Sequence, residues 1–284
     1  SAQQKPPLRH YSPPAMLSSA STPLRLSIGA CSLSSTTKLP WANEDAQFVA
    51  GNYCGVFDGV SALPASRAYA RRLSSLTRST LSRLAPDAAA WKGTAVSALQ
   101  AAARGANSLD GASTAALACV DLERRQLSTY VLGDSGWLLF APSASGRRLC
   151  ARSSRQLHRV GAPYQLVGGR RAERSDPPSS GLASTQPVLP GSVLLLHTDG
   201  LLGNLALDEI AGLVERDAAR GPRALARRLA SAARARRLRP DDVTVVAVLL
   251  DERGSTVDAS SVAAWGAVGL LGLAAASALQ HGAW

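Results

Sequence analysis

The feature that most constrains the fold is the order of the short apolar runs along the chain. Apolar segments of strand length occur at Leu24–Leu33, at Asp45–Gly59 and again between Ser113 and Phe140. Two helical patterns in succession, Ala65–Leu84 and Ala88–Asn107, separate the first strands from the later ones. Because strands outnumber helices and the helices come in pairs, the pattern predicts a layered α+β domain with packed antiparallel sheets.

The C-terminal half repeats this order of strands and paired helices. Ser192–His197 and Val243–Leu250 are apolar runs that predict buried strands. Leu207–Val214 and Pro222–Arg236 lie between them and have helical spacing. Residues 141–190 are polar and rich in Pro and Gly, so loops with short strands are expected there.

Two hairpins are expected among the early strands. Gly51 and Asn52 form a turn signal in the middle of the 45–59 segment. The second hairpin joins Ser113–Val120 to the apolar run Leu127–Phe140, with the charged residues 123–125 at the bend. Both hairpins favour antiparallel sheets.

The domain organisation follows from where the composition changes. The 284 residues suffice for one hydrophobic core, which we assign to residues 24–252. Residues 1–23 are rich in Ser, Pro and Ala, and no acidic residue precedes Glu44. This composition fits either the remnant of an organellar transit peptide or an ordinary disordered tail.

The C-terminal segment 259–284 is hydrophobic, and residues 259–280 carry no charge. As a helix, residues 262–280 would extend about 28 Å, close to a bilayer core of about 30 Å. Trp265 and Trp284 lie near its two ends, where interfacial aromatic residues are favoured. The segment therefore predicts a membrane anchor, with an Ala-rich helix packed on the domain as the alternative.

The bulk charge and the cysteines bound the class of protein. The net charge is +11, but the arginines are scattered and aromatic residues do not interleave with them, so nucleic-acid binding is not favoured. The four cysteines lie in apolar stretches without metal-ligand spacing. They are expected to be reduced thiols of a protein that is not secreted; they are Cys31, Cys54, Cys119 and Cys150.

Acidic residues occupy the ends of several buried strands. Asp58 and Asp199 each end an apolar run and precede a glycine, while Asp241 opens the last run. Glu44 and Asp45 open the strand that begins at residue 46. Each Asp-Gly alone is a turn signal, but together these carboxylates would repel one another at one rim of the core. Oxygen ligands without nearby His or Cys favour Mg²⁺ or Mn²⁺.

Six motifs in order give the chain a resemblance to the type 2C family of metal-dependent protein Ser/Thr phosphatases. They are NEDA at 43–46, GVFDGV at 55–60, GASTAAL at 111–117, LGDSGWLL at 132–139, LHTDGLLGNL at 196–205 and PDDVTVVAV at 240–248. The match covers residues 24–250, and LGDSG with APYQL at 162–166 resembles the compact branch found in mitochondria and plastids. The resemblance implies two packed antiparallel β-sheets flanked by helix pairs, with metals at one end.

The resemblance also implies roles for individual residues. Asp58 would bridge two Mg²⁺ or Mn²⁺ ions, the Gly59 carbonyl would bind the first, and Asp199 and Asp241 would bind the second. The catalytic set would thus be Asp58, Asp199 and Asp241. Glu44 and Asp45 would contribute directly or through water, and Asp134 would help to hold a third, weaker ion.

The sequence departs from the family pattern at several places. Pro40 stands where the family commonly has a phosphate-binding Arg, and Lys38 is the nearest cation that could replace it. Ser61-Ala62-Leu63 replaces the branch's Gly-Gly-Trp, and Gly203 replaces the second Asp of the DGLxDN motif. His158 is expected to be a loop or surface imidazole, although it could serve as a general acid, and the preferred interpretation of His197 is a core histidine.

Two functions are open at this point. The first is metal-dependent hydrolysis of phosphoserine and phosphothreonine on organellar phosphoproteins, in the mitochondrion or alternatively the plastid. The second is a structural subunit of a mitochondrial membrane complex that keeps a degenerate phosphatase fold. Metal binding and turnover distinguish the two.

Overall fold

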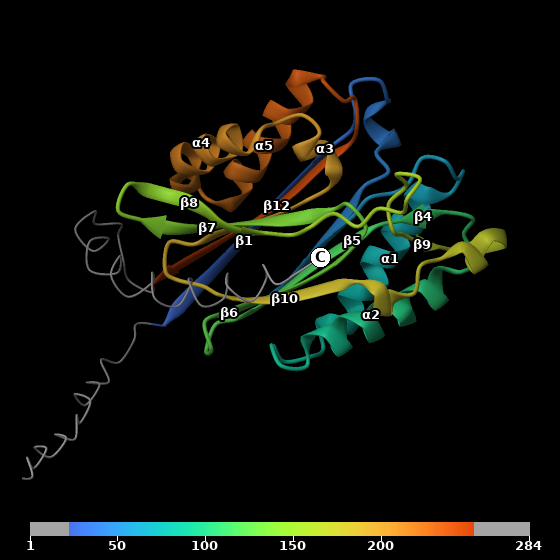
Figure 1. Ribbon diagram of the computed structural model, residues 1–284, viewed down its shortest axis with the longest axis horizontal. Coiled ribbons are helices and arrows are strands. Elements are labelled where there is room, and N and C mark those ends of the chain that lie inside the picture. The colour runs from blue at the N-terminus through green and yellow to red at the C-terminus, as the bar shows by residue number, and fades with distance from the viewer. Residues whose placement is uncertain (1–22, 253–284) are drawn as a thin grey trace, which may run out of the picture.

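The computed structural model describes residues 23–252, and these form two packed sheets between two layers of helices (Figure 1). One sheet has the strand order β1-β12-β11-β7-β8 and the other β10-β6-β5-β3-β2. All pairings within both sheets are antiparallel. The predicted α+β sandwich is therefore confirmed.

The strands of the first sheet are β1 (Leu24–Leu33), β7 (Gly136–Ser143), β8 (Gly146–Arg152), β11 (Val193–His197) and β12 (Val243–Glu252). Those of the second are β2 (Ala46–Ala50), β3 (Tyr53–Phe57), β5 (Ala115–Asp121), β6 (Gln126–Leu132) and β10 (Leu182–Pro187). A small separate pair is formed by β4 (Ala112–Ser113) and β9 (Leu166–Val167). The α-helices are α1 (Ser66–Leu81), α2 (Trp91–Ala106), α3 (Asp199–Leu202), α4 (Leu207–Asp217) and α5 (Pro222–Arg236).

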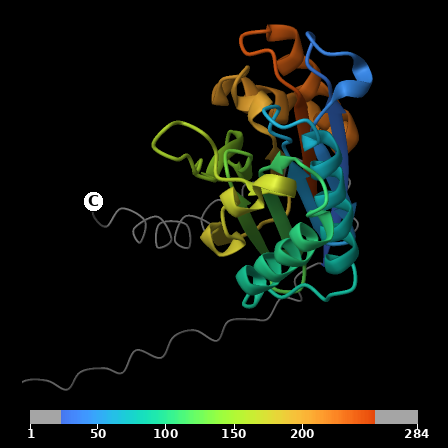
Figure 2. The same cartoon turned by 90° about the vertical axis from the view of Figure 1, so that its right-hand side faces the viewer.

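Side chains that alternate between the two faces of the central strands explain the layering. On β12, Val245 and Ala247 face α4 and α5, while Val246 and Val248 face the other sheet. Successive side chains of a strand point to opposite faces of the sheet. A strand that is apolar at every position is therefore covered by helices on one face and by the other sheet on the opposite face. The helices α1 and α2 cover the outer face of the second sheet in the same way, and Figure 2 shows the four layers from the side.

One expectation about the strands was partly wrong. The hairpin of β5 and β6 is present, but the apolar run Leu127–Phe140 does not continue as one strand. Gly133, at φ +107°, lies between β6 and β7, and the chain then passes to the other sheet. A positive φ is accessible to glycine without a Cβ clash, so the motif LGDSG forms a crossing between sheets rather than a strand.

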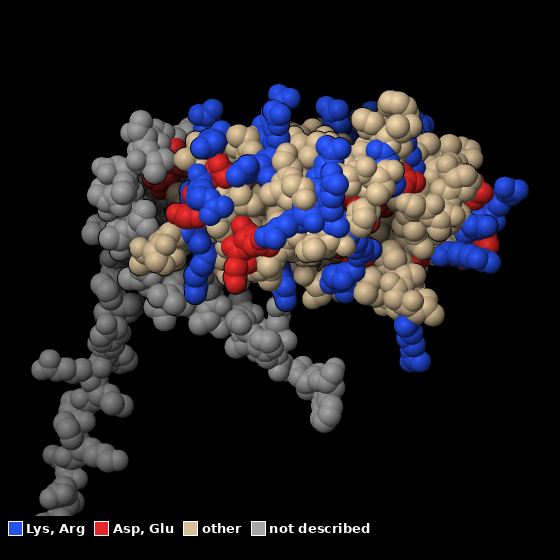
Figure 3. Space-filling model, turned by 90° about the horizontal axis from the view of Figure 1, so that it is seen from above, with Lys and Arg blue, Asp and Glu red and all other residues tan. Residues whose placement is uncertain are grey.

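Many basic side chains lie on one face of the molecule. Lys and Arg gather on the face covered by α4 and α5, as seen from above in Figure 3. No described helix is long and apolar enough to cross a membrane. The extension 1–22 and the proposed anchor at 262–280 lie outside the described residues, so both remain expectations.

The cysteines agree with the expected reduced state. Cys54 and Cys119 are buried, Cys31 and Cys150 are partly buried, and all four are free thiols. Burial raises the pKa of the Cys54 thiol to about 12. A thiol that stays protonated is neither a nucleophile nor a metal ligand, so Cys54 belongs to the core.

Candidate metal centre

The strand register brings the sequence-distant carboxylates to one end of the sandwich. Ala46 pairs with Phe57, so Asp45 and Asp58 flank the same end of the β2–β3 hairpin. His197 pairs with Val245, so Asp199 after β11 and Asp241 before β12 also come to one end. Each register brings two of these residues to one end of its own sheet, and the repulsion that Asp45, Asp199 and Asp241 exert on Asp58 places the two pairs near each other.

The carboxylates at this end influence one another strongly. Burial, followed by repulsion from Asp45, Asp199 and Asp241, raises the pKa of Asp58 well above its usual range. Burial likewise raises the pKa of Asp45 to about 8, although Thr198 donates a hydrogen bond of 2.8 Å to this carboxylate. Carboxylates that resist ionisation together form a site in which a multivalent cation is favourable.

The side chains do not yet converge as a complete ligand set. Within residues 23–252, no three His, Cys, Asp or Glu side chains form a group that could hold a metal ion. Basic side chains engage the carboxylates instead. Arg239 Nη2 lies 3.0 Å from Asp199 Oδ2, and Arg155 Nη2 lies 3.2 Å from Asp134 Oδ2.

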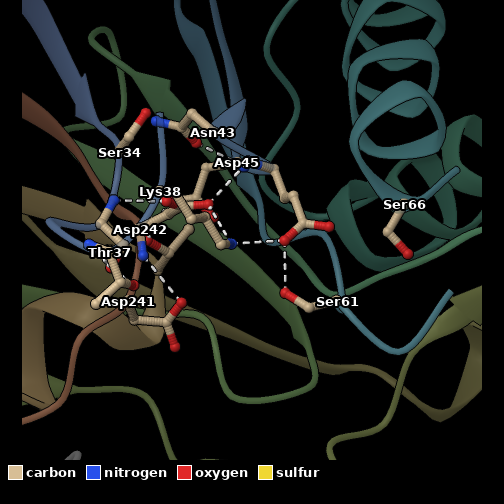
Figure 4. Close-up of polar contacts among 12 residues, drawn as sticks. Ser34, Thr37, Lys38, Asn43, Asp45, Ser61, Ser66, Asp241 and Asp242 are labelled. Carbon is tan, nitrogen blue, oxygen red and sulfur yellow. Dashed lines mark hydrogen bonds and ion pairs between the residues drawn. The ribbon is translucent and has the colours of Figure 1, made fainter. Parts of the chain in front are cut away.

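A second cation, Lys38, binds a different pair of carboxylates (Figure 4). Its Nζ lies 2.5 Å from Glu44 Oε2 and 3.0 Å from Asp242 Oδ2. Burial alone would lower the pKa of Lys38, but the hydrogen bonds to Glu44 and Asp242 hold this pKa above its ordinary value. Lys38 is therefore a charged partner of Glu44, whose other contact is the hydroxyl of Ser61 at 2.5 Å.

Asp242 is the residue at this end that sequence reasoning missed. It is buried and accepts backbone hydrogen bonds from Ser35 at 2.7 Å and from Glu44 at 2.8 Å. These contacts tie the loop after β1 to the start of β12. The doubled Asp of the PDDVTVVAV motif was a visible signal, but only the fold distinguishes this acceptor of backbone bonds from its neighbour Asp241.

Two glycines after the carboxylates allow the chain segments to approach closely. A Cβ on Gly59 would lie 2.6 Å from the carbonyl oxygen of Glu44. A Cβ on Gly200 would lie 2.0 Å from the carbonyl oxygen of Asp242. Both distances exclude a side chain, so the two Asp-Gly pairs have a packing role as well as a turn role.

The departures from the family pattern have local consequences. The segment Ser61–Leu63 forms a tight turn, in which the Leu63 amide donates to the Val60 carbonyl at 3.3 Å. Gly203 ends the short helix α3, and its amide donates to the Asp199 carbonyl at 2.8 Å.

Neither candidate histidine contacts the carboxylates of this end. His158 is exposed, stacks on Tyr164 and lies 3.1 Å from Asp176 Oδ2, as expected for a loop imidazole. His197 is buried in the sheet, and burial lowers its pKa to about 4. Its Nδ1 lies 3.1 Å from the Thr198 carbonyl oxygen, as expected for a core histidine.

The donor chemistry fits the cations expected from the sequence. The candidate ligands are carboxylate oxygens and the Gly59 carbonyl, and neither histidine nor any described cysteine contacts them. Oxygen-only sets of this kind suit Mg²⁺ and Mn²⁺. Asp58 is coupled to most of the set, because burial and then repulsion from Asp45, Asp199, Asp241 and Asp134 raise its pKa.

Comparisons by sequence and by structure both find protein phosphatases. No family model matches the chain. Probable protein phosphatase 2C 80 of Arabidopsis thaliana is 31% identical over 234 residues, which are 79% of this chain and 53% of that protein. The Drosophila sechellia protein phosphatase PTC7 homolog fig is 36% identical over 114 residues, 37% of this chain and 35% of that protein.

The solved structure of the photosystem II phosphatase PBCP superposes with a TM-score of 0.67 at 20% identity, over 79% of this chain and 98% of that one. A structure of the PstP catalytic domain with two manganese ions superposes with a TM-score of 0.54 at 18% identity, over 81% of this chain and all of that one. The chain thus spans about half or less of the curated relatives named above but nearly the whole of these structures. With the six motifs in order and the carboxylates at one end of the sandwich, the chain belongs to the type 2C family of metal-dependent protein Ser/Thr phosphatases.

Proposed function

We propose that this protein hydrolyses phosphoserine and phosphothreonine on proteins, using divalent metal ions held at the end of the sandwich. The observation that carries the proposal is that Asp45, Asp199 and Asp241, which lie at three other strand ends, all repel the buried Asp58. Their burial and mutual repulsion raise the pKa of Asp58 and Asp199. A structural domain has no evident need for such a set.

Each candidate residue would have its own part in holding the metal ions. Asp58, the Gly59 carbonyl, Asp199 and Asp241 would hold the Mg²⁺ or Mn²⁺ ions. Glu44 and Asp45 would complete the set directly or through water. Asp134 is the candidate for a third ion.

The chemistry that such ions supply is a water of lowered pKa and positive charge next to the phosphoryl oxygens. Around them, the described residues provide position and charge. Thr198 orients Asp45 by a hydrogen bond of 2.8 Å. Lys38 is 26% exposed in its side chain, so we assign it the contact with the substrate phosphate at the rim, made from its position beside Glu44.

The cellular setting is proposed from the sequence. The basic, acid-poor residues 1–23 and the resemblance to the compact branch support a mitochondrial protein, with a plastid as the alternative. Residues 262–280 would attach it to the inner membrane or to subunits of a membrane complex. Retention in the membrane after alkaline carbonate extraction, lost when residues 259–284 are deleted, is the expected result.

The second candidate function is that of a structural subunit whose phosphatase site is inactive. The ion pairs of Arg239 with Asp199 and of Lys38 with Glu44 favour it, because fixed cations can neutralise carboxylates that no longer bind metal. In that case the purified protein would bind no divalent ion and hydrolyse no ester.

The deciding experiment is an assay of the purified full chain on a phosphothreonine peptide with Mn²⁺, Mg²⁺ or EDTA. Turnover that requires the metal and disappears with EDTA is expected. Turnover unaffected by EDTA would contradict the proposed chemistry. Absence of both turnover and metal binding would favour the structural subunit.

A further inference from the structure

Arg239 is fastened to the turn that carries Asp199. Its backbone amide donates to Asn204 Oδ1 at 3.0 Å, and its carbonyl accepts from Asn204 Nδ2 at 2.8 Å. The same Asn204 amide donates to the Gly200 carbonyl at 2.9 Å. Through Asn204, the connection before β12 and the Asp199-Gly200 turn are held at a fixed distance, so Arg239 starts from a defined position.

From this position the guanidinium reaches both carboxylates assigned to the second metal ion. Nη2 lies 3.0 Å from Asp199 Oδ2, and Nε lies 4.0 Å from Asp241 Oδ2. The side chain of Asp199 is 10% exposed and that of Arg239 is 53% exposed. The carboxylate is therefore held in the protein while the guanidinium approaches it from solvent.

Gly203 provides the room for this approach. A Cβ at position 203 would lie 3.2 Å from Arg239 Cδ and 3.6 Å from Arg239 Cβ. The first distance is tighter than an ordinary contact between carbon atoms. The side chain of Arg239 thus passes over the position where the family's DGLxDN motif has its second Asp.

We propose that Arg239 is a built-in counter-cation of Asp199 and Asp241 that competes with the divalent metal for these two carboxylates. A guanidinium does not lose its proton in proteins, so the metal gains the carboxylates only when the whole side chain swings into solvent. Removing the guanidinium leaves Asp199 without its ion-pair partner and leaves Asp241 with only the more distant charge of Lys38. The chain would consequently be stabler without metal, and fill its second site at higher metal concentration, than a variant lacking Arg239.

The inference rests on the proposed metal site, and its test therefore measures binding directly. The full chain and Arg239→Gln are titrated calorimetrically with MnCl₂ alone, without substrate. Arg234→Gln is the matched control, because Arg234 is an exposed arginine of the last turn of α5 and makes no ion pair among the described residues. For Arg239→Gln we expect the second Mn²⁺ site, formed by Asp199 and Asp241, to tighten about threefold to fivefold, as for the loss of less than about 1 kcal/mol of competition.

A second variant tests the role of the glycine without changing any charge. Gly203→Ala places a methyl group 3.2 Å from Arg239 Cδ and 3.3 Å from the backbone carbonyl oxygen of Asp199, and it is expected to tighten the second Mn²⁺ site in the same direction. Because both changes act through one side chain, the double variant should bind Mn²⁺ as Arg239→Gln does, with no further gain. The melting temperature without metal should fall in Arg239→Gln and stay unchanged in Arg234→Gln.

Three results would be decisive against the inference or its foundation. Unchanged Mn²⁺ affinity in Arg239→Gln, with binding intact, would overturn the counter-cation role alone. A raised KM for phosphopeptide with unchanged Mn²⁺ affinity would also overturn it, since Arg239 would then be a substrate ligand. Absence of Mn²⁺ binding in the wild type and in every variant would overturn the proposed function.

Discussion

Lys38 and Arg239, two of the cations that pair with carboxylates at the end of the sandwich, serve different purposes. Lys38 bonds Glu44 and Asp242, and the buried Asp242 also accepts two backbone amides. We refer to these three residues as the Lys38 group. Arg239 bonds Asp199 and approaches Asp241 through side chains alone; these three residues are the Arg239 group.

The two groups differ in the contacts that their carboxylates make in addition to the ion pairs. Asp242 holds the loop after β1 and the start of β12 together, so the Lys38 group is part of the structure. Asp241 has an accessible carboxylate that accepts only from the neighbouring amide of Asp242, at 2.9 Å. The two adjacent acidic residues of one motif thus differ, because Asp242 holds backbone segments together whereas Asp241 keeps a partly exposed carboxylate.

The largest expected effect concerns Asp242. In Asp242→Ala the amides of Ser35 and Glu44 lose their acceptor and Lys38 loses a partner, so the free energy of unfolding should fall by about 3–5 kcal/mol. Urea unfolding with EDTA present measures this. In the matched variant Asp241→Ala, a change of less than about 1 kcal/mol is expected, and equal losses in the two variants would remove the distinction between the groups.

A buried titratable group at the same end, outside both groups, should make the fold sensitive to acid. Burial lowers the pKa of folded His197 to about 4, against an ordinary value of about 6.5. The neutral imidazole therefore contributes stability fully above pH 6.5, and this contribution is lost as pH falls toward 4, by up to about 3 kcal/mol. His197→Asn keeps a donor for the Thr198 carbonyl and cannot titrate.

The measurement is the slope of unfolding free energy against pH between 6.5 and 4, without metal. The slope in His197→Asn should be shallower than in the wild type by the contribution of one proton. Parallel slopes would show that the acid sensitivity comes from the carboxylate groups alone.

The Lys38 group and the Arg239 group can also be compared by removing the cation of each. Lys38→Met leaves two carboxylates unpaired, one of them buried, and should lower the metal-free unfolding free energy by about 1–3 kcal/mol. Arg239→Gln should lower it by less than about 1 kcal/mol, because the Arg239 side chain is half exposed. Urea titrations in EDTA give both values, and a larger loss in Arg239→Gln would reverse the assignment.

The smallest expected effect is that of restoring the family residue at position 203. Gly203→Asp should be tolerated, because the backbone at Gly203 is in the ordinary right-handed helical region. Its carboxylate would attract the Arg239 guanidinium away from Asp199, so turnover with Mn²⁺ should stay equal or rise a few-fold. Loss of turnover in a Gly203→Asp variant that still folds would show that turnover requires Arg239 in contact with Asp199.

The backbone of this fold was largely predictable from the sequence, and its side-chain pairing was not. β1 and both long helices follow apolar spacing, and the Gly51 turn at φ +58° follows from its glycine. The break in the run Leu127–Phe140 was missed, because periodicity continues through Gly133 while the chain changes sheets. The motif order predicted the set of carboxylates at one rim.

The partners of these carboxylates depend on contacts between distant segments. Asp242 bonds Ser35 across 207 positions of sequence, and no local pattern indicates such a pair. Arg239 was one of many arginines in a basic chain, and its position over Gly203 follows only from the way Asn204 holds it. The ends of the apolar runs and the motif order therefore indicated the candidate ligands, whereas tertiary packing determined which cation each one contacts.

The most direct test of the central claim is to compare the wild type with Asp58→Asn in a single MnCl₂ titration that follows both heat and phosphopeptide turnover. The account predicts that the wild type binds Mn²⁺ with turnover rising in parallel, and that Asp58→Asn loses nearly all turnover. It also predicts that the melting temperature of Asp58→Asn no longer rises with Mn²⁺, because linkage between metal and the folded state is lost. Metal-dependent turnover that persists in Asp58→Asn would contradict the account.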